Sequence, residues 1–147
     1  MKLLILNGPN INLLGLREPD IYGKKTYEEL LTFVKKACAD AGVSCECYQS
    51  NHEGALVDKI QAAYGVFDGI VFNPAAYTHT SVAIHDALLA VGIPTAEVHL
   101  TDTTSREDYR KINYITPCCK ATFQGLGFES YARAIRFLAD SADEKAL

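Results

Sequence analysis

Short apolar runs and amphipathic segments alternate along this chain. The apolar run at residues 3–6 ends at Asn7-Gly8-Pro9-Asn10, a pattern typical of a buried strand that leads into a loop. From Thr26 onward the apolar positions recur at helical spacing, and Thr26-x-x-Glu29 has the form of a capping box. The change of period predicts a strand followed, after a long loop, by a helix.

The same alternation continues over the rest of the chain. Apolar runs predict strands at residues 3–6, 43–48, 69–72 and 95–100, with a short fifth strand at 121–123. Helical periodicity predicts helices that start near Thr26, Leu56, Ser81 and Tyr131. Alternating strands and helices, without a linker or repeat, indicate an α/β fold with helices on both faces of a parallel sheet. Five strands within residues 1–147 fit a single domain with a flavodoxin-like open sheet, since a barrel typically needs about 250 residues.

Composition and charge narrow the classes of function. Apolar residues make up 48% of the 147 residues and charged residues 22%, as is usual for soluble globular proteins. The net charge is -4 and Lys and Arg form no long run, so a nucleic-acid-binding surface is not expected. The apolar stretches are shorter than the roughly 20 residues of a membrane-spanning helix. The run at residues 3–6 is also too short for a secretory signal, so we expect a cytoplasmic protein.

The five cysteines indicate neither a disulfide framework nor a zinc site. Their number is odd, and neither Cys45-x-Cys47 nor Cys118-Cys119 has the spacing of zinc ligands. We interpret Cys45 and Cys47 as ordinary strand residues. A nucleophilic Cys118 stays open as an alternative, although the sequence singles out no His partner for it.

Polar residues follow the predicted strands where a ligand is expected. In open parallel sheets, ligands bind beyond the carboxyl ends of the strands. Asn10 follows the first strand, and Asn73 and His79 follow the third. The fourth strand itself carries Glu97 and His99.

Glu97 and His99 are two positions apart in a strand, so both side chains point to the same face of the sheet. A carboxylate beside an imidazole favours the protonated ring and fixes its orientation, as a general acid requires. The alternative is a surface ion pair on an edge strand. The apolar residues around the pair favour a central strand instead.

The loop between the first strand and the first helix, residues 9–25, is long for a compact domain. We expect it to form a lid over the site. It carries Arg17 and Tyr22, with Gly15 and Gly23 as flexible points. The alternative is that Arg17 and Tyr22 are plain surface residues.

Nucleotide-binding patterns are absent or incomplete. The chain has no G-x-x-x-x-G-K motif, and the first loop lacks the Ser/Thr-rich phosphate cradle of a flavin-binding flavodoxin. Gly125-Leu126-Gly127 is half of a dinucleotide fingerprint and precedes the last helix, so we interpret it as a helix-packing motif.

Several long motifs occur in the order found in one enzyme family, and together they cover essentially the whole chain. In these motifs the sequence resembles the type II 3-dehydroquinate dehydratases. They are Asn7-Gly8-Pro9-Asn10, Leu14-Gly15, Arg17-Glu18-Pro19, Tyr22-Gly23, Gln49-Ser50-Asn51, Glu53-Gly54, Phe72-Asn73-Pro74, residues 76–83, Glu97-Val98-His99-Leu100, Arg106-Glu107 and Arg110.

The resemblance implies a reaction and an assembly. The reaction is the reversible anti dehydration of 3-dehydroquinate to 3-dehydroshikimate through an enolate, in the shikimate pathway of aromatic amino-acid biosynthesis or in quinate breakdown. The resemblance further implies a flavodoxin-like subunit, a homo-oligomer in the form of a dodecamer of four trimers, and no cofactor or metal. Two alternatives stay open, a flavodoxin-like binding module and an inactive paralogue that serves as a scaffold.

The resemblance also assigns roles to individual residues. It implies that Tyr22 is the base, that His99 is the acid, that Arg17 supports the transition state and that Asn10 holds the enolate. The implied substrate contacts are Asn73, His79, Asp86, Arg110 and the backbone of Leu100 and Thr101, with Asp86 reaching a neighbouring subunit's site.

Simple chemistry fits these roles. A tyrosine with a pKa of about 10 is a poor base at neutral pH, and a nearby cation such as Arg17 lowers that pKa by roughly 1–3 units. An amide N–H from Asn10, placed where negative charge develops, is a type of contact worth about 3 kcal/mol. The candidate site contains no lysine, so a Schiff-base route is not expected.

The chain departs from the family pattern at a few positions. Thr101-Asp102 stands where Ser-Asn is common, Thr104 where His is frequent, and Ala75 where Gly is common. Asp102 adds a negative charge near an anionic substrate, which we expect to weaken binding unless Arg106 neutralises it. None of these departures removes a residue to which a catalytic role is assigned.

Overall fold

The computed structural model describes residues 1–16, 19–22 and 24–146, without the side chains of residues 21, 22, 145 and 146. Its centre is a parallel sheet of five strands in the order β2-β1-β3-β4-β5. This is the flavodoxin-like strand order, so the predicted fold class is confirmed. The strands are β1 (Lys2–Asn7), β2 (Ser44–Gln49), β3 (Gly69–Asn73), β4 (Thr95–His99) and β5 (Ala121–Gln124).

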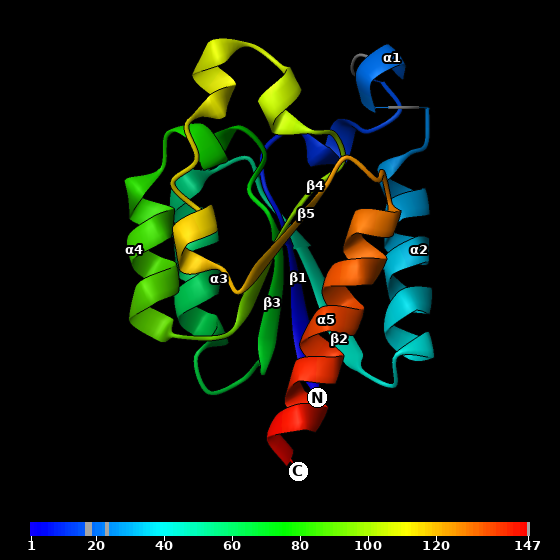
Figure 1. The fold of residues 1–147 in the computed structure, drawn as a ribbon, viewed down its shortest axis with the longest axis vertical. Helices are drawn as coiled ribbons and strands as arrows, with labels where there is room; N and C mark the ends of the chain where they lie inside the picture. The colour runs from blue at the N-terminus through cyan, green and yellow to red at the C-terminus, as the bar shows by residue number, and fades with distance from the viewer. Residues whose placement is uncertain (17–18, 23, 147) are drawn as a thin grey trace.

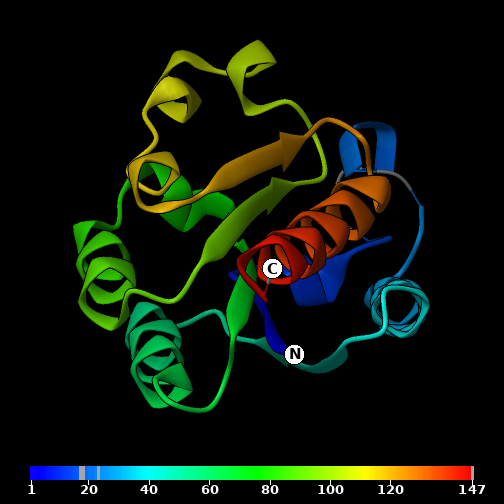
Figure 2. The ribbon, with the colours of Figure 1, turned by 60° about the horizontal axis from the view of Figure 1, so that its bottom comes forward.

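Helices cover both faces of the sheet (Figures 1 and 2). On one face lie α2 (Tyr27–Asp40) and α5 (Glu129–Ala146), and on the other lie α3 (Glu53–Ala63) and α4 (Val82–Val91). Because side chains alternate along a strand, Leu3 and Ile5 of β1 pack with the first helix pair, and Leu4 and Leu6 pack with the second. Both faces of β1 are therefore buried, which explains its continuous apolar run.

Shorter elements lie in the connections. They are α1 (Pro19–Tyr22) and the 3₁₀ turns η1 (Ile11–Leu13), η2 (Ala75–His79), η3 (Thr103–Ser105), η4 (Asp108–Lys111) and η5 (Thr116–Cys118). In Figure 1, α1 and the yellow-green segment with η3 and η4 lie on opposite sides of the carboxyl ends of the strands. None of the helices in the described part of the chain is long and apolar enough to span a membrane.

Two of the four predicted helix starts, Thr26 and Ser81, agree with the observed caps, whereas α3 and α5 begin at Glu53 and Glu129, a few residues before the predicted positions. Thr26 Oγ1 accepts a hydrogen bond from the Glu29 backbone N–H at 3.2 Å, and Ser81 Oγ accepts one from the Ile84 N–H at 3.0 Å. The last helix is longer than predicted. The apolar stripe ends near Leu138, but α5 continues to Ala146 through residues that mostly favour a helix, so periodicity alone underestimates it.

Two glycine-containing segments shape the edge of the sheet where the site lies. A Cβ atom at Gly8 would lie 2.5 Å from the Pro74 carbonyl oxygen, so only glycine allows the loops after β1 and β3 to approach this closely. Gly125 and Gly127 have φ angles of 81° and 58°, and a Cβ at Gly127 would meet no atom within 4 Å. The helix-packing interpretation of Gly125-Leu126-Gly127 is therefore wrong, because positive φ angles, and not close packing, require these glycines.

Candidate active site

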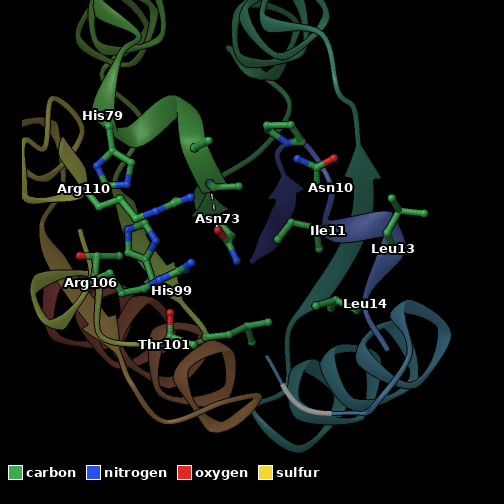
Figure 3. A pocket seen from close by; sticks show the side chains of 15 residues that line it. Asn10, Ile11, Leu13, Leu14, Asn73, His79, His99, Thr101, Arg106 and Arg110 are labelled. Carbon is green, nitrogen blue, oxygen red and sulfur yellow. Dashed lines mark hydrogen bonds between the residues drawn. The ribbon is translucent and has the colours of Figure 1, made fainter. Parts of the chain in front are cut away.

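A cavity opens at the carboxyl ends of β1, β3 and β4, around the point where the strand order reverses (Figure 3). This is the place where ligands bind in open α/β sheets. Its walls come from the turn after β1, the loop after β3, the end of β4 and the η3–η4 segment. The lining residues are Pro9, Asn10, Ile11, Leu13, Leu14, Asn73, Ala75, Ala76, His79, His99, Leu100, Thr101, Thr103, Arg106 and Arg110.

Glu97 and His99 form a buried pair at the end of β4. Their side chains point to the same face, and His99 Nε2 lies 2.6 Å from Glu97 Oε2. Glu97 is 0% exposed and His99 5% exposed. Because β4 lies between β3 and β5, a surface ion pair on an edge strand is excluded. With Nε2 committed to Glu97, Nδ1 is the ring nitrogen of His99 that is available to a ligand.

Three further side chains hold the Glu97 carboxylate. Thr116 Oγ1 and Thr122 Oγ1 donate to Oε1 at 2.5 and 2.9 Å, and Asn113 Nδ2 donates to Oε2 at 2.9 Å. Burial by itself would raise the pKa of Glu97, but the hydrogen bond and charge of His99, with the hydrogen bonds from Thr116 and Asn113, lower it to about 2. Glu97 is therefore ionised at neutral pH and orients the His99 ring.

A second histidine, His79, lines the cavity on the same side as His99 (Figure 3). His79 Nδ1 lies 2.7 Å from the Ile112 carbonyl oxygen, which only accepts, so Nδ1 carries the hydrogen. Burial lowers the pKa of His79, and the nearby charge of Arg110 acts in the same direction, although the hydrogen bond to Ile112 raises it. His79 therefore presents a neutral ring, with Nε2 as a hydrogen-bond acceptor.

Glu107 lies against two arginines beside the cavity. Arg110 Nε donates to Glu107 Oε2 at 2.8 Å, and Arg106 Nε lies 3.8 Å from the same oxygen. The side chains of both arginines are largely buried, at 13% exposure for Arg106 and 17% for Arg110. Their charges make this wall attractive to an anion.

The departures at positions 102 and 104 are linked to each other. Asp102 Oδ1 accepts hydrogen bonds from the Thr104 N–H at 2.9 Å and the Thr104 Oγ1 at 2.6 Å, and so caps η3. These hydrogen bonds lower the pKa of Asp102. Asp102 does not line the cavity, and Oδ1 of its carboxylate accepts its hydrogen bonds from Thr104. The expectation that Asp102 weakens the binding of an anionic substrate stays a prediction.

Polar contacts also fix the turn that carries Asn10. Asn10 has a φ of 69°, and its N–H donates to Asn51 Oδ1 at 3.0 Å. Gln49 Nε2 donates to the Gly8 carbonyl at 3.1 Å, to Asn51 Oδ1 at 3.1 Å and to Asn12 Oδ1 at 3.3 Å. The Gln49-Ser50-Asn51 motif therefore supports the Asn10 turn from β2.

The floor of the cavity contains a buried hydrogen-bonded chain that the sequence did not predict. The Ala75 N–H donates to Asn73 Oδ1 at 3.0 Å, and Asn73 Nδ2 donates to Tyr131 Oη at 3.0 Å. Tyr131 Oη donates in turn to Asn7 Oδ1 at 2.6 Å. Burial raises the pKa of Tyr131 far above its usual range, so it stays protonated. Ala75 adopts a φ of 53°, a conformation that favours the glycine common at this position.

The structure brings most of the predicted site residues together. Those that line the cavity are Asn10, Asn73, His79, His99, Leu100, Thr101 and Arg110, and Glu97 lies behind His99. Asp86 does not line it; its side chain is 72% exposed on α4, with Oδ1 3.1 Å from His85 Nδ1. Arg17 lies outside the described residues. Tyr22 ends α1, and its side chain also lies outside the description.

The residues that support the site from outside the cavity were not among the predicted site residues. Asn113, Thr116 and Thr122 hold Glu97, Tyr131 holds Asn73, and Glu107 contacts the arginines. A buried carboxylate requires several hydrogen-bond donors, so donors to Glu97 could be expected, but this rule does not identify Asn113, Thr116 or Thr122.

Cys118 lacks the environment of a nucleophile. Its Sγ donates to the His85 carbonyl at 3.6 Å, and burial raises its pKa, with the charges of Asp86 and Glu97 acting in the same direction. Reactive cysteines have lowered pKa values, so this alternative finds no support. The described residues also include no group of three or more His, Cys, Asp or Glu that could hold a metal ion.

Comparison with known proteins identifies close relatives. The sequence profile of the family described as "Dehydroquinase class II" matches residues 1–139. The 3-dehydroquinate dehydratase of Geotalea daltonii is 48% identical over 136 residues, covering 92% of this chain and 94% of that protein. The catabolic 3-dehydroquinase of Verticillium alfalfae is 49% identical over 138 residues, covering 94% of this chain and 92% of that protein. The crystal structure of type II dehydroquinase from Butyrivibrio crossotus has a TM-score of 0.92 at 48% identity, covering 94% of this chain and 97% of that one.

Proposed function

The chain belongs to the class II dehydroquinase family, and from this premise we propose that it catalyses the reversible anti dehydration of 3-dehydroquinate to 3-dehydroshikimate. Membership of the family places this reaction in the shikimate pathway. The single observation that best supports the activity at this site is the buried Glu97–His99 pair, whose histidine faces a cavity at the carboxyl ends of the strands.

The proposed chemistry removes water in two steps. Tyr22, with its pKa lowered by Arg17, takes the proton beside the ketone, and the electrons of the C–H bond form an enolate. Asn10, on the turn after β1, donates a hydrogen bond to the enolate oxygen. The enolate then collapses, the bond to the hydroxyl breaks, and His99 gives its proton to the leaving oxygen so that water departs.

Glu97 makes His99 suitable as that acid. An ionised Glu97 at 2.6 Å accepts a hydrogen bond from Nε2 and so fixes the ring, which leaves Nδ1 to deliver the proton. A protonated Glu97 would lose this effect. The three further donors to the carboxylate therefore support the acid step, because they favour the ionised form.

The remaining lining residues recognise the substrate in this proposal. The backbone N–H groups of Leu100 and Thr101, together with Asn73, bind its carboxylate, and the arginines on the adjacent wall supply positive charge. Neutral His79 accepts a hydrogen bond from a hydroxyl, and Arg110 contacts another oxygen. Thr101 keeps the hydroxyl of the serine it replaces.

The proposal extends to assembly, lid and compartment. Asp86 is exposed and lies outside the cavity of its own subunit, which is the position expected of a residue that contacts the substrate of a neighbouring subunit. This supports a homo-oligomer, which the family resemblance gives as a dodecamer of four trimers. The chain acts as one domain over residues 1–147, with residues 9–25 as the lid, in the cytoplasm and without a cofactor.

Adding 3-dehydroquinate to the purified protein tests the activity. The conjugated product absorbs ultraviolet light, so absorbance should rise at once and reach an equilibrium from either side of the reaction. His99→Ala is the matched control and should remove the rise. Absence of turnover in the folded wild type would favour the inactive paralogue, and bound flavin colour would favour the binding module.

A further inference from the structure

Tyr131 has no role in the chemistry above, although its hydroxyl accepts a hydrogen bond from Asn73, which lines the cavity. It lies on α5, is 0% exposed, and joins Asn7 at the end of β1 to Asn73 at the end of β3. We propose that Tyr131 is a positioning residue that fixes Asn73 as a hydrogen-bond donor toward the substrate. This inference rests on the proposed contact between Asn73 and the substrate.

The direction of the hydrogen-bonded chain follows from its backbone end. The Ala75 N–H can only donate, so the Asn73 atom 3.0 Å away is the acceptor Oδ1. Nδ2 of Asn73 must then face Tyr131. The hydroxyl of Tyr131 has one hydrogen, which is given to Asn7 Oδ1, so Oη accepts from Asn73 Nδ2.

This arrangement decides what Asn73 offers to a ligand. Oδ1 is bound to the Ala75 N–H, and one of the two Nδ2 hydrogens is bound to Tyr131. The second Nδ2 hydrogen is the free donor. Asn73 is 2% exposed and lies in the cavity between Asn10 and His99 (Figure 3). The matching substrate atom is an acceptor oxygen, such as that of a carboxylate.

Removal of the Tyr131 hydroxyl would free the Asn73 amide to turn. The Nδ2 hydrogen now bound to Oη would be buried without an acceptor, and rotation of the amide to satisfy it would draw the other hydrogen away from the substrate. The contact lies away from the bonds that break, so it acts equally on bound substrate and transition state. The expected effect is therefore on KM more than on kcat.

Steady-state kinetics of a mutant cycle test the inference. Tyr131→Phe should raise KM about tenfold, the loss expected for one hydrogen bond, with kcat within about twofold of wild type. Asn73→Ala should raise KM at least as much. If Tyr131 acts through Asn73, the double variant should have the same KM as Asn73→Ala alone.

Tyr27→Phe is the matched control. Tyr27 lies on α2 and does not line the cavity. Burial raises its pKa, and the hydrogen bond with the Asn7 side chain opposes part of this rise. Tyr27→Phe removes a hydroxyl beside Asn7, the asparagine that Tyr131 also contacts, and leaves the contacts of Asn73 unchanged. The KM of Tyr27→Phe should therefore equal that of wild type. Equal increases of KM in Tyr27→Phe and Tyr131→Phe would overturn the inference in favour of general loosening.

The outcomes separate this inference from the proposed contact. If Asn73→Ala leaves KM unchanged, the substrate contact fails and the positioning role fails with it, while measured turnover still stands. If Asn73→Ala raises KM but Tyr131→Phe does not, or if the two effects multiply, only the positioning role is overturned.

A second variant covers the case in which Tyr131→Phe does not fold. Replacement of Tyr131 by 3-fluorotyrosine keeps the hydroxyl and the shape but makes the oxygen a weaker acceptor. KM should then rise about twofold with kcat unchanged, since a hydrogen bond is weakened and not lost. An unchanged KM in this folded variant would overturn the inference.

Discussion

Thr122 on β5 stands directly beside Glu97 on β4 in the sheet register, and its hydroxyl donates a 2.9 Å hydrogen bond to the Glu97 carboxylate. The last strand of the sheet, β5, thus contributes a hydrogen-bond donor to the Glu97–His99 pair, although Thr122 does not line the cavity. In the proposed mechanism, Thr122 would therefore act only through Glu97 and His99.

Thr122→Val tests this contribution, because valine keeps the shape and removes the donor. The buried carboxylate would lose one partner, so the free energy of unfolding should fall by about 1–3 kcal/mol and the pKa of Glu97 should rise. Urea unfolding at neutral pH measures the first effect. Thr122→Ser, which keeps a hydroxyl, should stay close to wild type. Wild-type stability in Thr122→Val would contradict the prediction.

The stability of the protein should depend on the ionisation of Glu97. Its pKa is about 2 in the folded chain against 4.5 as the ordinary value, so the folded state favours the carboxylate. The resulting stability is fully present above about pH 5 and is lost as the pH falls toward 2. In Glu97→Gln this position does not titrate. Between about pH 5 and pH 2, the free energy of unfolding of the wild type, measured with urea, should fall by roughly 3 kcal/mol more than that of Glu97→Gln. Parallel pH dependences of the two proteins would argue against this role of Glu97.

Tyr22→Phe should abolish turnover while substrate binding and folding are kept. The variant lacks the proposed base but loses little volume. Tyr64→Phe is the matched control, since Tyr64 is 71% exposed at the end of α3 and lies outside the cavity. If Tyr22→Phe keeps more than about a tenth of the wild-type rate, the loss is below about 1.4 kcal/mol and Tyr22 is not the base.

A mixing experiment tests whether Asp86 serves a neighbouring subunit. Tyr22→Phe and Asp86→Ala subunits, each inactive or weak alone, are combined under conditions that allow exchange. If sites are shared, some mixed sites contain both intact groups and activity returns. Mass measurement confirms that mixed assemblies form. Mixed assemblies that stay inactive would show that Asp86 acts in its own subunit or has no role.

Ala75→Gly should stabilise the protein, since Ala75 has a φ of 53° in the wall of the cavity. Relief of the left-handed strain, of order 1–3 kcal/mol, exceeds the added entropy of the unfolded chain, so a gain of about 1 kcal/mol is expected. Ala76→Gly is the control and should lose stability, because Ala76 has no positive φ. Urea midpoints distinguish the two, and a loss in both variants would contradict the expectation.

The sequence predicted the parts of the site that depend on local rules. Glu97 and His99 are two residues apart, and alternation along a strand brings them together whatever the rest of the chain does. The parallel sheet followed from the alternation of elements, and the position of the cavity followed from the rule that ligands bind beyond the carboxyl ends of such strands. The roles of Arg17 and Tyr22 came from family resemblance, and they stay predictions.

Other residues could not be predicted because their partners are distant in sequence. Thr122 reaches Glu97 only through the register of β4 and β5, and Tyr131 reaches Asn7 across 124 positions. Such contacts depend on how elements pack, and a single sequence contains no local sign of them. The interpretation of Gly125-Leu126-Gly127 as a packing motif fails because a sequence does not distinguish glycines that allow close packing from glycines that adopt positive φ angles.

The contact between Gly8 and Pro74 limits which molecules the cavity can accept. The Gly8 N–H donates to the Asn73 carbonyl at 2.8 Å, so main chain joins the loop that carries Asn10 to the loop that carries Asn73. At this contact Gly8 has no side chain that could change rotamer, and a Cβ there would meet the Pro74 carbonyl oxygen at 2.5 Å. The spacing of these two main chains is therefore fixed, and we expect adjustment to a differently shaped ring to come from the opposite wall with Arg106 and Arg110. A library of variants selected for activity on new substrates should therefore yield active proteins when positions on the wall of Arg106 and Arg110 are varied, and none when position 8 is varied.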